Sequence, residues 1–71
     1  MPLSNDLLKL SSREIQVIRM AAEGHCYKEI GRDLGISWRT VANHMASVLD
    51  KMKATSQANA VYKCMQAGII A

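Results

Sequence analysis

The residues with the clearest chemistry in this sequence recur three or four positions apart between positions 38 and 53. Arg39 can reach a phosphate or donate two hydrogen bonds to a guanine edge, and Asn43 can pair with adenine through its amide. Ala42 and Ala46 share the same side of a helix, where a small side chain can touch a thymine methyl and allow close approach. We therefore predict that Arg39, Ala42, Asn43 and Ala46 read base edges in DNA. The alternatives are a solvated surface charge for Arg39 and a plain surface amide for Asn43.

A second group of residues carries the positive charges or hydroxyl groups that bind phosphate oxygens. Such contacts fix the register of a protein on DNA and give an affinity that falls with salt. Lys28 comes near the start of an expected helix, where the helix dipole also favours an anion. The predicted phosphate-binding residues are Lys28, Ser37, Thr40, Lys51 and Lys53. For the lysines the alternative is a free surface side chain, and for Thr40 it is a hydrogen bond to its own helix backbone.

Other residues with reactive or aromatic side chains fit no chemical site. Trp38, the only tryptophan, could pack against a DNA sugar or another protein, or form a half-buried ring over a turn. We interpret His44 as a structural or phosphate-side histidine rather than a metal ligand. His25, Cys26, His44 and Cys64 do not have the spacing of zinc ligands. Since no catalytic set can be argued from the spacing either, we expect no metal and no cofactor, and we predict that the protein is not an enzyme.

Local signals predict four helices that would position these residues. The expected cap residues are Ser11, Cys26, Ser37 and Ser56. Ser11 and Glu14 have the spacing of a capping box. The expected helix-ending glycines are Gly24, Gly35 and Gly68. The second helix is expected over residues 27–34 and the third over 38–53, and the short turn between them gives a helix-turn-helix arrangement.

Apolar residues at helical spacing predict which helix faces are buried. The expected buried positions of the first helix are Ile15, Val17, Ile18, Ala21 and Ala22. Those of the third and fourth helices are Val41, Met45, Val48, Met52, Ala60, Val61 and Cys64. Because no stretch alternates as a strand does, we predict an all-α fold: a compact four-helix domain with a central helix-turn-helix over residues 10–71. Residues 1–9 are expected to be an N-terminal arm or the end of a linker.

The bulk composition agrees with a small basic domain. The chain has 71 residues, of which 49% are hydrophobic, and a net charge of +3. A mildly basic domain suits a polyanionic partner. The two cysteines could form one disulfide, but nothing suggests a disulfide framework, and we expect reduced thiols in a cytosolic protein. With no signal peptide and no apolar run near the about 18 residues of a membrane span, we expect a cytoplasmic location.

Six short motifs, in order along residues 10–70, resemble the LuxR-type (NarL/FixJ, GerE-like) helix-turn-helix. They are Leu10-Ser11-Ser12-Arg13-Glu14, Ala22-Glu23-Gly24, Lys28-Glu29-Ile30, Leu34-Gly35-Ile36-Ser37 with Thr40-Val41 and His44, Lys51-Met52, and Ala60-Val61 with Gly68-Ile69-Ile70. The resemblance covers nearly the whole chain. It implies a bacterial transcriptional regulator that binds double-stranded, near-palindromic operator DNA through the major groove.

The same resemblance implies partners and a place in a larger protein. Members of the family bind as homodimers through the fourth helix, which points to Gln57, Val61 and Met65. RNA polymerase is a further candidate partner, although no residue locates that contact. The run at 51–54 is most similar to the FixJ branch of response regulators, which favours the output domain of a two-component system. A stand-alone regulator and a quorum-sensing-type domain remain alternatives, and the sequence leaves open whether a sensor or receiver domain precedes Met1.

The chain departs from the family pattern at several positions. Ala42 stands where the family usually has a basic residue, Gln57 where it often has Arg, and Gly31 where it often has Ala. Cys26 replaces a frequent Ser cap. The missing charge at Ala42 motivates a rival reading, in which the chain is a protein-interaction module that kept the fold but no longer binds DNA.

Overall fold

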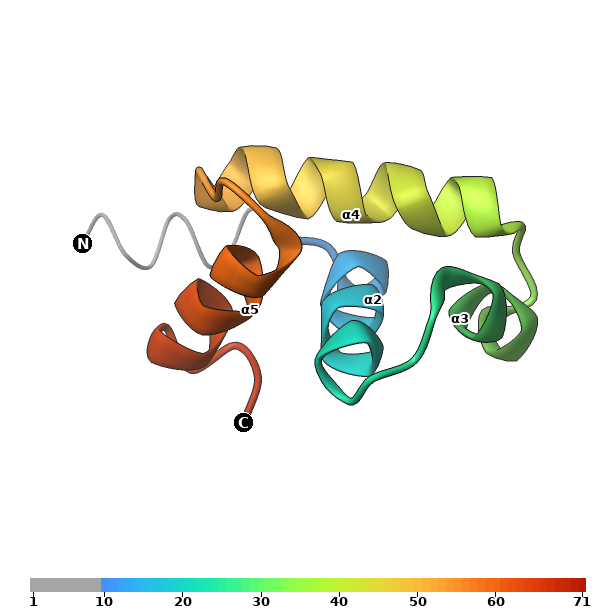
Figure 1. The fold of residues 1–71 in the computed structure, drawn as a ribbon, viewed down its shortest axis with the longest axis horizontal. Helices are drawn as coiled ribbons and strands as arrows, with labels where there is room; N and C mark the ends of the chain where they lie inside the picture. The colour runs from blue at the N-terminus through green and yellow to red at the C-terminus, as the bar shows by residue number, and fades with distance from the viewer. Residues whose placement is uncertain (1–9) are drawn as a thin grey trace.

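The computed structural model describes residues 10–71, so the expected N-terminal arm at residues 1–9 lies outside the described part. Within residues 10–71 there are four helices and no strand, which confirms the predicted all-α, four-helix fold. The helices are α2 (Ser12–Ala22), α3 (Tyr27–Leu34), α4 (Trp38–Met52) and α5 (Gln57–Gln66). The longest helix, α4, runs across one side of the molecule with the other three packed along it (Figure 1).

Serine side chains cap α2, α4 and α5 where the sequence predicted them, whereas at Cys26, the expected cap of α3, the backbone N–H donates to the Glu29 Oε1 at 2.9 Å. The Ser11 Oγ accepts a hydrogen bond from the Glu14 N–H at 3.1 Å, and the Glu14 Oε1 accepts one from the Ser11 N–H at 2.8 Å, so the capping box is confirmed. The Ser37 and Ser56 hydroxyls each accept a backbone N–H three residues ahead at 3.1 Å. These bonds satisfy N–H groups that have no partner inside a helix.

The ends of the helices are set by residues in the left-handed backbone region. Gly35 ends α3 with a φ of 72°, a conformation that costs glycine little because it has no Cβ. The third helix ends at Met52, one residue before the predicted end, because Lys53 takes a φ of 54° and becomes the C-cap. The reading helix is therefore slightly shorter than predicted.

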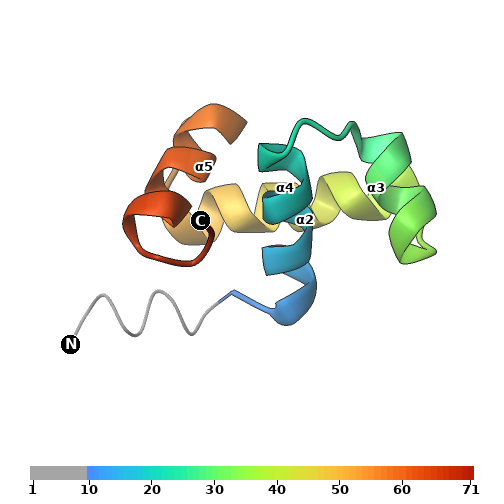
Figure 2. The same cartoon turned by 90° about the horizontal axis from the view of Figure 1, so that it is seen from below.

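The hydrophobic core lies where α2 crosses α4, with α3 on one side of α2 and α5 on the other (Figure 2). The buried apolar residues are Leu10, Val17, Ile18, Ala21, Ile30, Val41, Met45, Val48, Ala60, Cys64 and Ile70. Four of the expected core residues are wrong or only partly right. Ala22 is exposed because the buried face of α2 is centred on Val17, Ile18 and Ala21. Met52 and Val61 are half-buried at the margin of the core, as is Ile15.

Among residues 10–71, no helix is both long enough and apolar enough to cross a membrane.

Candidate nucleic-acid interface

The turn between α3 and α4 is packed so closely that it fixes the direction of α4. Gly31, buried in α3, faces the backbone of this turn, and the Ile36 N–H donates to the Gly31 carbonyl oxygen at 2.9 Å. A Cβ at position 31 would lie 2.6 Å from the Ile36 carbonyl oxygen, well inside van der Waals contact. The departure from Ala at this position therefore has a structural reason: only glycine allows the observed approach.

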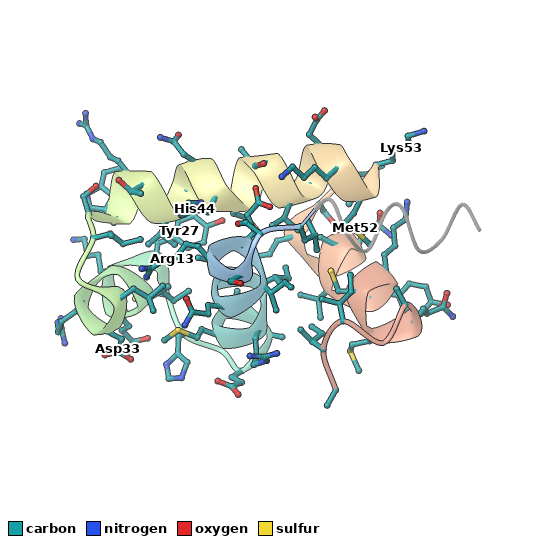
Figure 3. All side chains as sticks on the ribbon, turned by 180° about the vertical axis from the view of Figure 1, so that it is seen from behind. Arg13, Tyr27, Asp33, His44, Met52 and Lys53 are labelled. Carbon is teal, nitrogen blue, oxygen red and sulfur yellow. The ribbon has the colours of Figure 1, made fainter. Side chains whose placement is uncertain are left out.

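The outer face of α4 carries the predicted base-reading residues. Arg39, Asn43 and Ala46 are exposed, and Ala42 is half-buried on the edge of the same face. Side chains project outwards along α4, and no other helix of residues 10–71 lies over them (Figure 3). Because the core residues Val41, Met45 and Val48 occupy the opposite side, the outer face is available to a large partner.

Trp38, the first residue of α4, is exposed rather than half-buried over the turn. Its relative exposure is 48%, and the guanidinium carbon of Arg39 lies 5.5 Å from the centre of its ring. That distance is within the range of a cation–π interaction. The two neighbouring side chains thus form a stacked pair at the start of α4, next to the Ser37 cap.

The predicted phosphate-binding hydroxyls are engaged in the cap of α4. The Ser37 Oγ accepts the Thr40 N–H, and the two hydroxyl oxygens of Ser37 and Thr40 lie 3.0 Å apart. Only one hydroxyl hydrogen can lie between them, so the other can point elsewhere. Lys28, the second residue of α3, and Lys53, after the end of α4, are both exposed, and Lys53 extends away from the body at the end of the helix (Figure 3).

Lys51, also predicted to bind phosphate, lies against a carboxylate of the protein itself. Its Nζ is 2.9 and 3.1 Å from the two carboxylate oxygens of Glu14, a side chain that is only 7% exposed. The Ser47 hydroxyl donates to the Glu14 Oε2 at 2.5 Å. Glu14 therefore joins the start of α2 to two residues of α4, in addition to capping its own helix.

These contacts decide the protonation state of Glu14. Burial alone would raise the pKa of this carboxyl group, but hydrogen bonds from Ser47, Lys51 and the Ser11 N–H, together with the charge of Lys51, lower it from 4.5 to about 2. The carboxylate is therefore ionised and paired at neutral pH. The Glu14–Lys51–Ser47 cluster holds α4 against α2.

Helix α5 carries the residues predicted to pair two copies of the chain. Met65 is 51% exposed, Val61 is half-buried, and the Gln57 Oε1 accepts a hydrogen bond from the Tyr27 hydroxyl at 2.9 Å. Tyr62, which the sequence reasoning did not single out, is 58% exposed. An apolar strip of Val61, Tyr62 and Met65 thus lies on the surface of α5.

Neither the histidines nor the cysteines form a metal site. Among residues 10–71, no group of three His, Cys, Asp or Glu side chains could hold a metal ion. Cys26 and Cys64 are free thiols, the first exposed and the second buried. His44 is half-buried on α4 (Figure 3).

Comparison with known proteins assigns this arrangement to a family. Residues 8–64 match the GerE family, described as bacterial regulatory proteins of the luxR family. The chain belongs to the LuxR family. Membership of this family of non-enzymatic DNA-binding regulators supports DNA binding and transcriptional regulation as the function of this domain. The predicted resemblance is thereby confirmed.

Several transcriptional regulators are similar to this LuxR-family domain. Transcriptional regulatory protein YdfI of Bacillus subtilis (strain 168) is 39% identical over 62 residues, 87% of this chain. Transcriptional regulatory protein FixJ of Azorhizobium caulinodans is 45% identical over 60 residues, 84% of the chain, and transcriptional activator protein SolR of Ralstonia solanacearum is 42% identical over 69 residues, 97% of the chain. The alignments cover 29%, 28% and 28% of these relatives, so the chain spans less than a third of their length.

Two cationic side chains of this LuxR-family domain have roles that the sequence analysis missed. The Lys63 Nζ donates to the carbonyl oxygens of Lys53 at 2.8 Å and Met52 at 3.3 Å, at the end of α4. The Arg13 guanidinium donates to the Leu34 carbonyl oxygen at 3.5 Å, at the end of α3. Both cations lie where a helix presents unpaired carbonyls and negative dipole charge. Their sequence positions gave no signal, because each acts on a helix other than its own.

Proposed function

We propose that this domain binds near-palindromic operator DNA as a homodimer, with α4 of each protomer in the major groove of one half-site. The observation that carries the proposal is the uncovered outer face of α4, which presents Arg39 and Asn43 beside two alanines. A major groove about 12 Å wide admits one α-helix. This face is open to a duplex, and the net charge of +3 attracts the negatively charged DNA backbone.

Four residues have proposed base-reading roles. Arg39 donates to a guanine edge or a phosphate, and Asn43 pairs with adenine through its carboxamide. Ala42 and Ala46 contact thymine methyl groups and leave room for α4 to approach the base edges. Ala42, half-buried, has a smaller share of the contact than Ala46.

The phosphate contacts are proposed for residues around the ends of α3 and α4. Lys28 and Lys53 supply exposed ammonium groups, and the outward hydroxyl of Ser37 or Thr40 supplies a hydrogen-bond donor. For Lys51 we propose an indirect part, since its ammonium group is bonded to Glu14. It supports DNA binding by holding α4 in place.

The homodimer is proposed to form through α5. Met65 and Val61, one helical turn apart, pack with their counterparts in a second copy, and Tyr62 widens the contact. Gln57 lies at the margin of this surface, where its bond to Tyr27 orients it. Sedimentation equilibrium should detect the dimer, and Met65→Glu should shift it to monomer because it places a charge in an apolar contact. An unchanged association constant in Met65→Glu would exclude this surface.

The domain is further proposed to be the output domain of a response regulator in the cytoplasm, and RNA polymerase is a proposed additional partner. The similarity to the transcriptional regulatory protein FixJ supports this proposal. A stand-alone or quorum-sensing-type regulator is the alternative. The length and domain content of the native gene product would distinguish them.

The decisive experiment is selection of bound duplexes from a library with randomised half-sites, followed by fluorescence anisotropy at several salt concentrations. The logarithm of the affinity should fall linearly with the logarithm of the salt concentration, by about 0.9 for each phosphate contacted. Lys28→Ala removes one contact per protomer, so it should reduce the slope of a dimer by about 1.8. Arg19→Ala is the matched control, since it removes the same charge from an exposed position beside Ile70 and Ala71. If no duplex binds at low salt, the protein-interaction module becomes the better description.

A further inference from the structure

Trp38 is an exposed aromatic side chain that neither the core nor the proposed dimer explains. Three large hydrophobic residues among residues 10–71 are exposed: Trp38, Tyr62 and Met65. The last two share the surface of α5, where a second copy can cover them. Trp38 lies instead at the start of α4, next to the residues proposed to read DNA.

The placement of Trp38 links it to the chemistry of its neighbour. The Arg39 guanidinium lies over the Trp38 ring at 5.5 Å. A guanidinium stacked on a ring keeps the N–H groups at its edge free to donate in its own plane. Stacking also limits the conformations of a long flexible side chain before DNA arrives, so less freedom is lost on binding.

Arg39 matters more here than one arginine usually would. It is the only Lys or Arg between positions 38 and 50, and its neighbours on the outer face, Ala42 and Ala46, are uncharged. The next cation along the helix, Lys51, is bonded to Glu14. The direction of the Arg39 guanidinium therefore governs most of the charged recognition that the outer face of α4 can provide.

We propose that Trp38 is a specificity-determining residue for DNA, acting in two ways. Its ring positions the Arg39 guanidinium for a guanine edge, and its uncovered surface packs against the deoxyribose of the adjacent nucleotide. The proposal rests on the proposed binding of DNA by α4. It adds a positioning residue to that site. The preference for guanine at one base pair then depends on Trp38, although Trp38 itself makes no hydrogen bond to the base.

The single tryptophan makes the proposal directly measurable in the unmodified protein. Its emission reports position 38 alone. Adding a saturating amount of the selected duplex should change the emission and protect the ring from quenching by acrylamide. Anisotropy of a dye on the DNA reports binding independently. If the duplex binds and acrylamide quenching stays the same, the proposal is wrong while the DNA-binding function stands. If no duplex binds, the proposed function fails first.

Substitutions test the positioning role separately. Trp38→Ala should lower affinity for the selected duplex about fivefold for each half-site and so about 25-fold for the dimer, the equivalent of a cation–π interaction of about 1 kcal/mol in each protomer. It should also reduce the preference for guanine at one position, and Trp38→Phe should restore that preference because it keeps a ring under the guanidinium. In an Arg39→Ala background, the loss from Trp38→Ala should be smaller. Independent, multiplicative losses from the two substitutions, or an unchanged base preference in Trp38→Ala, would overturn the proposal.

Discussion

Replacing Lys51 with methionine tests the contact that holds the reading helix against the rest of the domain. The substitution keeps an unbranched side chain but removes the ammonium group that lies 2.9 Å from Glu14. The Glu14 side chain, 7% exposed in the wild-type structure, then keeps Ser47 and the Ser11 N–H as its partners but loses its cation. We expect the Lys51→Met domain to fold with a lower free energy of unfolding.

The size of the loss follows from the pKa of Glu14. A pKa of about 2 in place of 4.5 corresponds to about 3 kcal/mol of stabilisation at neutral pH, shared by all the groups that bind the carboxylate. Hydrogen bonds to charged groups are worth about 1.5–3 kcal/mol each. We therefore expect Lys51→Met to lose about 2 kcal/mol, which lowers the midpoint of thermal unfolding of a domain this size by about 8–16 °C.

The lowered pKa of Glu14 also predicts how the stability difference between wild type and Lys51→Met changes with pH. Because folding lowers the pKa of Glu14, its contribution is present above about pH 4.5 and is lost as the pH falls towards about 2. Wild type and Lys51→Met should therefore differ at neutral pH and converge in acid, where a protonated Glu14 no longer needs a cation.

Urea unfolding followed by circular dichroism at a series of pH values measures this convergence. Lys53→Met is the matched control, since it removes a charge from an exposed lysine two positions further on. Equal unfolding free energies at neutral pH, or a difference that persists unchanged in acid, would refute the reasoning. On DNA, the salt dependence of Lys51→Met should equal that of wild type, and a smaller slope would show that Lys51 contacts a phosphate directly.

Two further predictions concern the turn and the reading face. Gly31→Ala should lower the free energy of unfolding by about 1–3 kcal/mol, because the new Cβ would lie 2.6 Å from the Ile36 carbonyl oxygen; an unchanged thermal midpoint would mean that the turn shifts at no cost. Asn43→Ala should relax the preference for one base pair in binding selections, and an equal loss of affinity on every duplex would contradict its reading role.

The fold was predictable because its signals are local. Ser11, Ser37 and Ser56 each bond a backbone group three residues away, and Gly35 needs only its own backbone angles. Apolar spacing then identified most of the buried face of each helix. It failed at Ala22, where the position of the neighbouring helices decides which side of a short helix is covered.

The candidate site was less predictable because its contacts join distant parts of the chain. The exposure of Arg39 and Asn43 followed from the buried stripe on the opposite side of the same helix. The pairing of Lys51 with Glu14 joins residues 37 positions apart, and no spacing rule reaches that far. The exposure of Trp38 was equally hidden, since a ring at the start of a helix can turn either way.

The bonds from Lys63 to the end of α4 have a consequence for the geometry of the operator. In the proposed dimer, α5 connects the two protomers, and the same helix holds the last carbonyls of the reading helix through Lys63. On its other side, Gln57 is tied to α3 through Tyr27. Because α5 is bonded to both α4 and α3, the structure of each protomer sets the distance between the two reading helices of the proposed dimer. The dimer should therefore require one particular separation of the half-sites. Inserting one base pair at the centre of the operator should weaken binding, because it changes both the distance between the half-sites and their helical phase.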